Sequence, residues 1–301
     1  MKNYLEQNSI MNKRFVLSYA EFYITNVCNL TCTGCNRFNN YKFKGWQDWH
    51  QVKDSYTTWS QEFDIKIYSM LGGEPLLNPT FYDWVIGLRQ LWPNGTLRIA
   101  SNGTQLERHH QLYNILLTDS KIVFSVCLHN KRTKKELVQK VKDFLVAPFT
   151  YEADTTPYRE KLIITDSNGV SVQIHHNWWF HQGAIRLDPE TGQQTLHQSD
   201  PEKAHDICHS KTCHHFENGK LYKCGPASLF KQYDEQHQLQ LSPEDRQLIN
   251  SYVPLSITDS TETKQVFLNN LPNSISMCKF CPESYQGQQI FAEEKKVVFA
   301  R

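Results

Sequence analysis

Residues 28–35 read Cys28-Asn29-Leu30-Thr31-Cys32-Thr33-Gly34-Cys35, and they directly follow a predicted strand over Tyr19–Thr25. Three thiols at the spacing CxxxCxxC on a short loop can ligate three irons of a cubane and leave the fourth iron open. Ordinary [4Fe–4S] electron carriers use four cysteines, so a loop with three predicts a cluster that binds a small molecule at its free iron. A zinc site is the alternative, but structural zinc sites usually take four ligands in CxxC pairs.

Strands and helices alternate along the chain that follows this loop. Short segments rich in β-branched and aromatic residues predict strands, and apolar stripes with a 3.6-residue period predict helices between them. The alternation indicates an α/β fold with a parallel sheet, in which ligands bind at the carboxyl ends of the strands. The predicted strands are Tyr19–Thr25, Asp64–Leu71, Thr96–Ala100, Lys121–Leu128, Lys161–Thr165 and Val170–His175, and the predicted helices are Pro79–Leu91, Thr104–Leu117 and Lys134–Leu145.

Two turns after the second and third predicted strands carry groups suited to a ligand. Leu71 leads into Gly72-Gly73-Glu74-Pro75. Two glycines let the backbone approach a ligand closely, and the carboxylate of Glu74 can pair with an ammonium group. The third strand leads into Ser101-Asn102-Gly103-Thr104, which also contains the ordinary turn pair Asn-Gly. Both turns are expected at the same edge of the sheet as the cysteine loop.

Taken together, these motifs resemble the radical S-adenosylmethionine (SAM) superfamily, whose hallmark is CxxxCxxC after the first strand of a partial (β/α)6 barrel. The resemblance implies a catalytic [4Fe–4S] cluster whose open iron binds the amino and carboxylate groups of SAM. It also implies that an electron from the cluster cleaves SAM to methionine and a 5′-deoxyadenosyl radical, which abstracts a substrate hydrogen. The residues implied are Cys28, Cys32 and Cys35 for the cluster and Gly72, Gly73, Glu74, Ser101, Asn102 and Ser125 for SAM.

One position departs from the family pattern. Many members carry an aromatic residue just before the last cysteine, where it touches the adenine of SAM, but Gly34 stands there in this chain. Another contact must support the adenine, and Phe38 is a candidate.

The fourth predicted strand offers a candidate catalytic residue. Its period of two places Ser125, Cys127 and His129 on one face. If this face points into the barrel, Cys127 lies near the substrate and could return a hydrogen atom to a substrate radical. A small buried hydrophobe is the alternative for a lone strand cysteine. Further on, residues 175–181 (His-His-Asn-Trp-Trp-Phe-His) could line a substrate pocket or pack two domains together.

Five more cysteines occur in the last third of the chain. Asn218-Gly219 predicts a hairpin that puts Cys213 and Cys224 on either side of a turn. A distant CxxC completes a set of four ligands, and the spacing favours Cys208, Cys224, Cys278 and Cys281, with Cys213 as the substitute for Cys208. This arrangement resembles the twitch domain, the shortened form of the SPASM domain, which implies an auxiliary [4Fe–4S] cluster. Structural zinc stays open as the alternative.

Length and composition fit one large domain, or a large and a small one. The chain has 301 residues, 39% hydrophobic and 21% charged, which allows a packed core. The polar, turn-rich segment Pro189–Asp206 predicts a linker. We therefore expect the barrel in residues 1–190, and the linker with the auxiliary-cluster domain in residues 191–301.

The charge balance and the cysteines limit the cellular compartment and the classes of binding partner that we expect. Lys plus Arg number 32 against 31 for Asp plus Glu, so the balance indicates neither nucleic acid nor an anionic membrane. Met1–Arg14 lacks the apolar run of a signal peptide, and no apolar stretch approaches the roughly 18–20 residues that cross a bilayer. Nine cysteines in such a chain fit metal sites in a reducing compartment, so a cytoplasmic protein is expected.

The resemblance implies an oxidoreductase-type enzyme that modifies a peptide, a protein or a small molecule. Its partners would be SAM and a low-potential electron donor such as flavodoxin or ferredoxin. Two alternatives remain. Nucleotide or RNA modification would use the basic run at residues 131–135, and a non-catalytic iron–sulfur or zinc scaffold would keep the fold without the chemistry.

Overall fold

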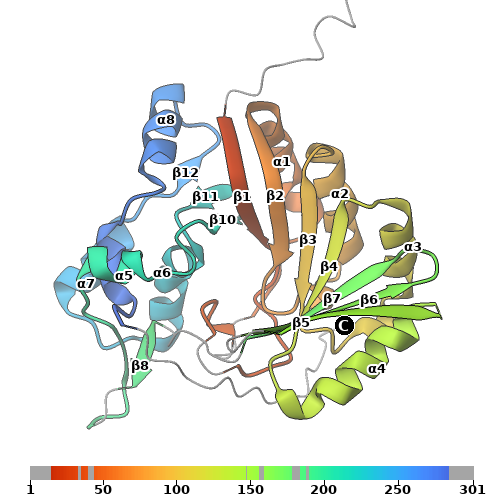
Figure 1. Cartoon of the computed structure of the whole chain (residues 1–301). Coiled ribbons are helices and arrows are strands. Elements are labelled where there is room, and N and C mark those ends of the chain that lie inside the picture. Colours follow the sequence, from red (N-terminus) through yellow and green to blue (C-terminus); the bar gives the residue numbers. More distant parts are fainter. Residues whose placement is uncertain are drawn as a thin grey trace, which may run out of the picture.

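The computed structural model describes residues 15–32, 35–39, 44–146, 148–155, 159–177, 184–187 and 190–284. Within these residues the chain builds an α/β fold around one large sheet (Figure 1). The strands of this sheet are β1 (Phe15–Tyr23), β2 (Phe63–Leu71), β3 (Thr96–Ser101), β4 (Ile122–Cys127), β5 (Phe149–Thr155), β6 (Arg159–Asp166), β7 (Ser171–Asn177), β10 (His214–Glu217), β11 (Lys220–Tyr222) and β12 (Leu255–Ser256).

The strand order is β12-β11-β10-β1-β2-β3-β4-β7-β6-β5. Neighbouring strands from β10 to β7 are parallel, and antiparallel strands extend this parallel block at both ends. The predicted α/β architecture with a large, mostly parallel sheet is therefore confirmed. Because the order is linear within the described residues, closure into a partial (β/α)6 barrel stays a prediction.

Four helices connect the parallel strands and pack on one face of the sheet, which we call the outer face (Figure 1). Fully buried aromatic side chains fill this contact. The ring of Trp59 lies 4.7 Å from that of Phe63 and 5.1 Å from that of Phe216 in β10. Truncating such a residue typically lowers the free energy of unfolding by about 3–5 kcal/mol. Because Trp59 contacts Phe216, this core also joins the C-terminal strands to the N-terminal ones. The helices are α1 (Trp49–Glu62), α2 (Phe81–Leu91), α3 (His110–Thr118) and α4 (Lys134–Phe144).

The strand–helix alternation ends after α4, which corrects the sequence prediction. The predicted strands at Lys161–Thr165 and Val170–His175 exist as β6 and β7, but they pair antiparallel. Only a short turn containing Gly169 joins them, and a parallel connection needs a dozen residues or more. β5 then pairs antiparallel with β6 and lies at the edge of the sheet.

The segment predicted as a linker, Pro189–Asp206, contains regular secondary structure. A two-stranded sheet of β8 (Ile185–Leu187) and β9 (Gln194–Leu196) leads into α5 (Pro201–Asp206). Asp200 caps that helix, because its side chain accepts hydrogen bonds from the backbone of Glu202 and Lys203. The remaining helices are α6 (Gly225–His237), α7 (Pro243–Ser251) and α8 (Thr261–Asn270).

The predicted hairpin at Asn218-Gly219 is confirmed. Both residues have positive φ, 48° and 71°, and they join the antiparallel strands β10 and β11. Cys213 directly precedes β10, and Cys224 follows β11 after one intervening residue, so the two cysteines lie on either side of the turn. Since β10 pairs with β1, residues on both sides of position 190 share one sheet.

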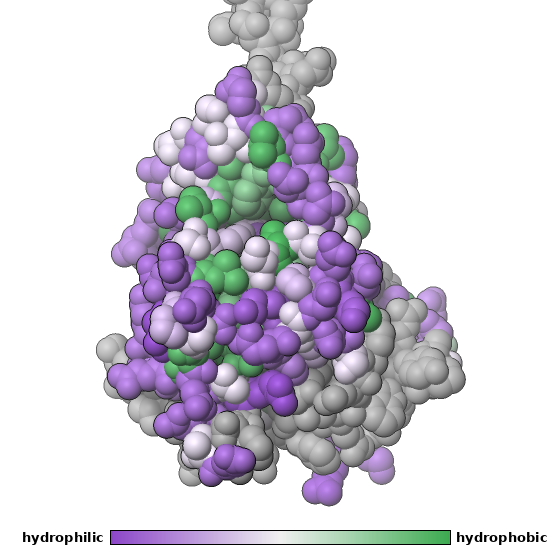
Figure 2. All heavy atoms as spheres, turned by 90° about the vertical axis from the view of Figure 1, so that its left-hand side faces the viewer, coloured by the Kyte–Doolittle hydropathy of each residue, from purple (hydrophilic) through white to green (hydrophobic). Residues whose placement is uncertain are grey.

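Helices α5 to α8 lie beside the β10–β12 end of the sheet (Figure 1). Figure 2 shows this side of the molecule, where hydrophilic side chains predominate and hydrophobic ones form separate small patches. Scattered surface hydrophobic residues are ordinary and mark no site by themselves. Among the helices of the described ranges, none combines the length and the apolar character that a membrane crossing requires.

Candidate functional site

The first cysteine loop leaves the carboxyl end of β1 and is fixed to the turn after β2. The backbone N–H of Gly73 donates to the carbonyl of Thr25 at 2.7 Å, and that of Glu74 donates to the carbonyl of Val27 at 2.8 Å. These bonds place the start of the loop directly beside the Gly-Gly turn. Cys28, Cys32 and Cys35 are all partly exposed, whereas Gly34 lies outside the described residues.

The two glycines are required by a close approach between two backbone segments. A Cβ on Gly72 would lie 2.5 Å from the carbonyl oxygen of Thr25, and one on Gly73 would overlap Val27 and come within 2.9 Å of the Cβ of Cys28. We expected the glycines to admit a ligand. The contact that excludes a side chain here is instead with the chain that carries the first cysteine.

Glu74 also has a different environment from the one expected. Its side chain is fully buried, and its two oxygens accept hydrogen bonds from Ser101 Oγ (2.7 Å), Asn102 N (2.7 Å) and Leu76 N (3.1 Å). Both oxygens therefore accept hydrogen bonds from the protein itself in this conformation. In this conformation Glu74 instead connects the turn after β2 to the turn after β3.

This buried carboxyl predicts a pH dependence of stability. Burial raises the pKa of Glu74 from 4.5 to about 7, against the lowering effect of its three donors. A raised pKa means that the folded state binds a proton more tightly than the unfolded state. The stabilisation is therefore full below about pH 4.5, falls between 4.5 and 7, and is lost above 7, a change of about 3 kcal/mol.

Urea unfolding of the unaltered protein and of Glu74→Gln at pH 5 and pH 8 measures this contribution. The difference in unfolding free energy between the two proteins should fall by about 2–3 kcal/mol from pH 5 to pH 8. A difference that stays constant or grows with pH would show that the carboxyl is ionised in the folded state throughout this range.

Two asparagines connect the cysteine loop to the turn after β3. Asn102 donates through Nδ2 to Oδ1 of Asn29 at 2.9 Å, and Asn29 donates through Nδ2 to Oγ1 of Thr104 at 2.7 Å. The Oδ1 atom of Asn102 in turn accepts from the hydroxyl of Thr104 at 2.7 Å. The loops after β1, β2 and β3 therefore form one hydrogen-bonded unit, as the sequence predicted from their position on the strands.

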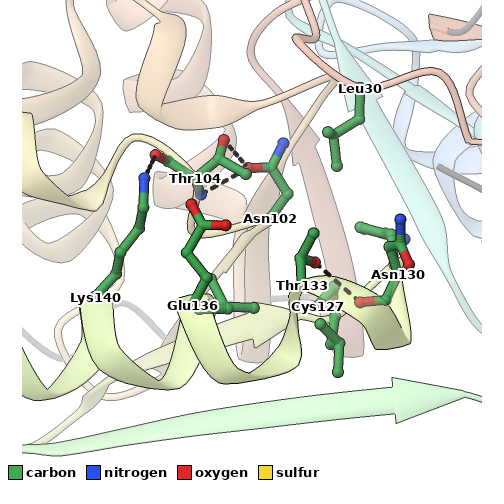
Figure 3. A pocket seen from close by; sticks show the side chains of 11 residues that line it. Leu30, Asn102, Thr104, Cys127, Asn130, Thr133, Glu136 and Lys140 are labelled. Atoms are coloured by element: carbon green, nitrogen blue, oxygen red, sulfur yellow. Dashed lines mark hydrogen bonds between the residues drawn. The ribbon is translucent and has the colours of Figure 1, made fainter. Parts of the chain in front are cut away.

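A pocket of about 280 Å³ opens beside this unit (Figure 3). Leu30 of the cysteine loop lines it, together with Asn102 and Thr104 after β3, and Cys127 at the end of β4. The rest of the wall comes from the segment that follows β4 and from the first turns of α4: Leu128, His129, Asn130, Thr133, Glu136, Leu137 and Lys140.

The pocket lining mixes apolar side chains with a few polar ones. Glu136 is exposed, and Figure 3 shows its carboxylate turned towards Thr104. Lys140 donates to the carbonyl of Thr104 at 2.9 Å and pairs with Glu107 at 3.1 Å. Burial lowers the pKa of His129 to about 4, so this imidazole is neutral near pH 7. Such a wall can bind an uncharged group with several hydroxyl or amine functions.

Several residues of this site carry no signal of their own in the sequence motifs. Glu136 and Lys140 line the pocket, and Asn29 belongs to the hydrogen-bonded unit beside it, but none of them was predicted as a site residue. The available signal was positional, because a helix that follows a parallel strand begins at the carboxyl edge of the sheet. Because the strand before α4 was predicted, the first turns of this helix could also have been predicted to line a ligand site.

The predicted candidates on β4 separate into two environments. Cys127 lines the pocket, and burial raises its pKa, so the thiol keeps its hydrogen. Ser125 is fully buried and accepts a hydrogen bond from Arg98 at 3.0 Å, and it is not among the pocket residues. Within the described residues, the serine is therefore engaged by the protein, as Glu74 is.

A buried polar cluster occupies the inner face of the sheet, opposite the helices. Glu21 of β1 forms an ion pair with Arg37, and its carboxylate lies 3.6 Å from Nδ1 of His215. Tyr19 donates to Ser69 at 2.8 Å in the same cluster. Arg37 lies two residues after Cys35, so this cluster adjoins the first cysteine loop.

Four cysteines of the second group are close enough to affect one another's pKa values. The thiols of Cys208, Cys224, Cys278 and Cys281, which we call the four-cysteine group, act on one another electrostatically. Burial, and then the charges of the other three thiols, raise the pKa of Cys281 well above its ordinary value. Burial also raises the pKa values of Cys224 and Cys278, so without a cation these two thiols and that of Cys281 hold their protons, and a metal that bound here would displace them.

Cys213 lies in different surroundings from the four-cysteine group. Burial, and then the carboxylate of Glu21, raise the pKa of Cys213 to about 12, while Arg37 acts in the opposite direction. Its strongest charged neighbours therefore belong to the polar cluster on the inner face. Cys208 is a weaker neighbour of the same thiol.

The chemistry of both cysteine groups fits a thiolate-bound metal centre. The backbone N–H of Leu30 donates to Sγ of Cys28, and that of Ile275 donates to Sγ of Cys278, both at 3.4 Å. Cys224 precedes α6 and accepts from the backbone of Ala227. Such donors to sulfur stabilise ligated thiolates. In the part of the chain that the structure describes, no group of three or more Cys, His, Asp or Glu side chains is arranged to hold a metal ion.

Two further predictions concern Phe38 as an adenine contact and residues 175–181 as the lining of a substrate pocket. Phe38 is fully buried and packs against Phe230 and Tyr233, with ring centroids 5.7 and 5.2 Å away, so it is a core residue and not an adenine contact. In the stretch 175–181, Nδ1 of His176 donates a hydrogen bond to the carbonyl of Leu128 at 2.8 Å. Residues 178–181 lie outside the described residues.

Comparison with known proteins gives little further information. No family model matches the chain, and no curated protein matches it. Among solved structures, the chain is similar to the crystal structure of BtrN in complex with AdoMet and 2-DOIA, at 24% identity and a TM-score of 0.29. The match covers 37% of this chain and 46% of the BtrN chain, so the chain spans less than half of that protein's length. At this TM-score the likeness carries no argument.

Proposed function

We propose that this chain is a radical SAM enzyme in which Cys28, Cys32 and Cys35 hold a [4Fe–4S] cluster with one iron left free for SAM. One observation supports the proposal most strongly. The loops after β1, β2 and β3 carry the three motifs, and Glu74 and the Asn29–Asn102 bond join them into one unit. When bound, the cluster supplies the electron that breaks a C–S bond of SAM and leaves methionine and the 5′-deoxyadenosyl radical.

The pocket beside this unit has suitable groups for the nucleoside part of SAM. The carboxylate of Glu136 can accept hydrogen bonds from ribose hydroxyls, as acidic residues do in other nucleotide sites. Leu30 and Leu137 offer apolar contact to a base. Cys127, whose thiol stays protonated, would face the reacting end and can donate a hydrogen atom to a substrate radical.

The four-cysteine group would hold an auxiliary [4Fe–4S] cluster, with zinc as the alternative occupant. An auxiliary cluster would accept an electron from the substrate radical or bind the substrate directly. We therefore favour oxidation or modification of a peptide, a protein or a small molecule, in the cytoplasm, with flavodoxin or ferredoxin as the electron donor. The nucleic-acid alternative gains no support from the basic run, because Lys134 pairs with Glu160 of the same chain.

The proposal is tested by anaerobic reconstitution with iron and sulfide, followed by reduction with a strong reductant in the presence of SAM. We expect release of 5′-deoxyadenosine together with methionine in equal amounts. If SAM stays intact under these conditions while the iron is fully bound, the scaffold alternative is favoured and the proposal of an enzyme is wrong.

A further inference from the structure

The inner face of the sheet is only partly covered at its centre. In β3, Leu97 and Ile99 are fully buried beneath the helices. The alternate side chains, those of Thr96, Arg98 and Ala100, lie on the inner face and stay partly exposed. Parallel sheets usually bury both faces, so a partly exposed row on a central strand is a position where a ligand can complete the cover.

Arg98 places a positive charge in the middle of this face. Its Nη2 donates to Oγ of Ser125 in β4 at 3.0 Å. A guanidinium group has five N–H donors, so this bond satisfies only one of them. Among the described residues, no carboxylate forms an ion pair with Arg98, and its one bonded neighbour is a neutral hydroxyl.

Arg89 in α2 shows how the same fold treats an arginine with a structural role. Its guanidinium donates to the carboxylate of Asp119 at 2.7 Å. It also donates to the hydroxyl of Tyr68 and to the carbonyl of Gly95, both at 2.8 Å. The charge and the donors of Arg89 are thus used within the protein. Those of Arg98 are not, so we expect its anionic partner to come from outside the chain.

Two neutral side chains beside Arg98 can bind the same anion. Since the Oγ atom of Ser125 accepts from Arg98, its hydroxyl hydrogen can be donated to another group. Gln173 of β7 lies next to Ser125 in the strand register and is partly exposed, so its amide can also donate. A single guanidinium balances one negative charge, and its planar fork matches the two oxygens of a carboxylate.

The predicted hydrogen donor lies on the same face of β4. Cys127 follows Ser125 by two residues, which is about 6–7 Å along a strand, and it lines the pocket beside the first cysteine loop. Burial raises the pKa of its thiol, and the charge of Arg98 acts against this effect. A molecule whose carboxylate is bound at Arg98 can therefore reach Cys127 with its neighbouring carbon atoms.

We propose that Arg98 binds a carboxylate group of the substrate, with Ser125 and Gln173 as supporting donors, and thereby places the adjoining carbon atoms beside Cys127. The inference rests on the proposed function, because it names the chemical class of the substrate of that enzyme. The carboxylate of SAM is assigned to the free iron of the cluster, which leaves Arg98 for the substrate.

The test measures binding with acetate as the probe and with acetamide as its uncharged counterpart. The full chain is reconstituted anaerobically and kept oxidised, and the transverse relaxation of the methyl protons of each probe is followed through a titration. We expect acetate to bind and acetamide to stay free. Arg98→Met should weaken acetate binding about tenfold or more. Arg98→Lys keeps the charge but loses the planar fork, so it should weaken binding less.

Arg132→Met is the matched control, because Arg132 is an exposed arginine in the segment before α4 and lies off the inner face. Its replacement should leave acetate binding unchanged. Thermal unfolding shows whether each variant is folded. If Arg98→Met does not fold, Arg98→Gln replaces it, since glutamine keeps a donor for the hydroxyl of Ser125.

The outcomes separate this inference from the proposed function. Acetate that binds Arg98→Met as well as the unaltered protein, or that does not bind the unaltered protein at all, overturns the role of Arg98. Displacement of acetate by SAM also overturns it, because the site would then belong to the carboxylate of SAM. Arg98-dependent binding in a protein that leaves SAM intact would contradict the proposed enzyme and leave an anion site at Arg98.

Discussion

Replacing Cys32 by alanine is expected to abolish the release of 5′-deoxyadenosine from SAM and to remove about half of the iron of a fully reconstituted protein. Cys32 is the middle cysteine of a loop that offers three thiols, and all three are partly exposed. A cubane held by two cysteines has lost the arrangement that leaves a single iron open. The measurements are iron per chain and 5′-deoxyadenosine by chromatography.

Cys127→Ala is the control for this prediction. Cys127 lines the pocket and is not proposed as a ligand, so its replacement should leave the iron content unchanged and should still allow SAM cleavage. If Cys32→Ala retained both its iron and its cleavage activity, the first cysteine loop would not be the catalytic site.

Cys281→Ala is expected to leave SAM cleavage in place but to remove the second metal centre and stop product formation. Burial, and then the thiols of Cys224, Cys208 and Cys278, raise the pKa of Cys281, which places it inside the four-cysteine group. Losing one of four ligands opens that centre without touching the loop after β1. The measurements are iron or zinc per chain and the ratio of 5′-deoxyadenosine to modified product.

Cys213→Ala is the matched control, since it removes a cysteine from the same segment. Glu21 is the strongest charged neighbour of Cys213, so its loss should leave the metal content of the second centre unchanged. The reverse result, with metal lost in Cys213→Ala and kept in Cys281→Ala, would exchange the roles of these two cysteines.

Local signals in the sequence predicted most of the parallel block and its loops. The strands β1 to β4 and the helices α2 to α4 follow from short-range periodicity. The Asn218-Gly219 hairpin follows from turn chemistry, because both residues adopt positive φ. Each of these features depends on residues that are close together in the chain.

Elements with weak local signals were missed. β5 is exposed along nearly its whole length and therefore shows no alternation of buried and exposed residues. Helix α1 contains aromatic and β-branched residues of modest helix propensity, and packing of Trp59 against Phe63 and Phe216 stabilises it. Both elements therefore form because of tertiary contacts and not because of local sequence preferences.

Pairing between distant segments could not be predicted either. The polar cluster around Glu21 forms because β10 pairs with β1, which brings His215 beside a residue almost two hundred positions earlier. The buried state of Glu74 depends on Ser101 and Asn102 in another turn.

The central claim is that the first cluster has an iron that the protein leaves without a thiolate. The most direct measurement is the electron paramagnetic resonance spectrum of the reduced cluster in a Cys278→Ala/Cys281→Ala chain, recorded with and without SAM. We predict a clear change of the spectrum when SAM is added, because its amino and carboxylate groups bind that iron. A spectrum that SAM leaves unchanged, or a zinc ion in the loop after β1, would contradict the account.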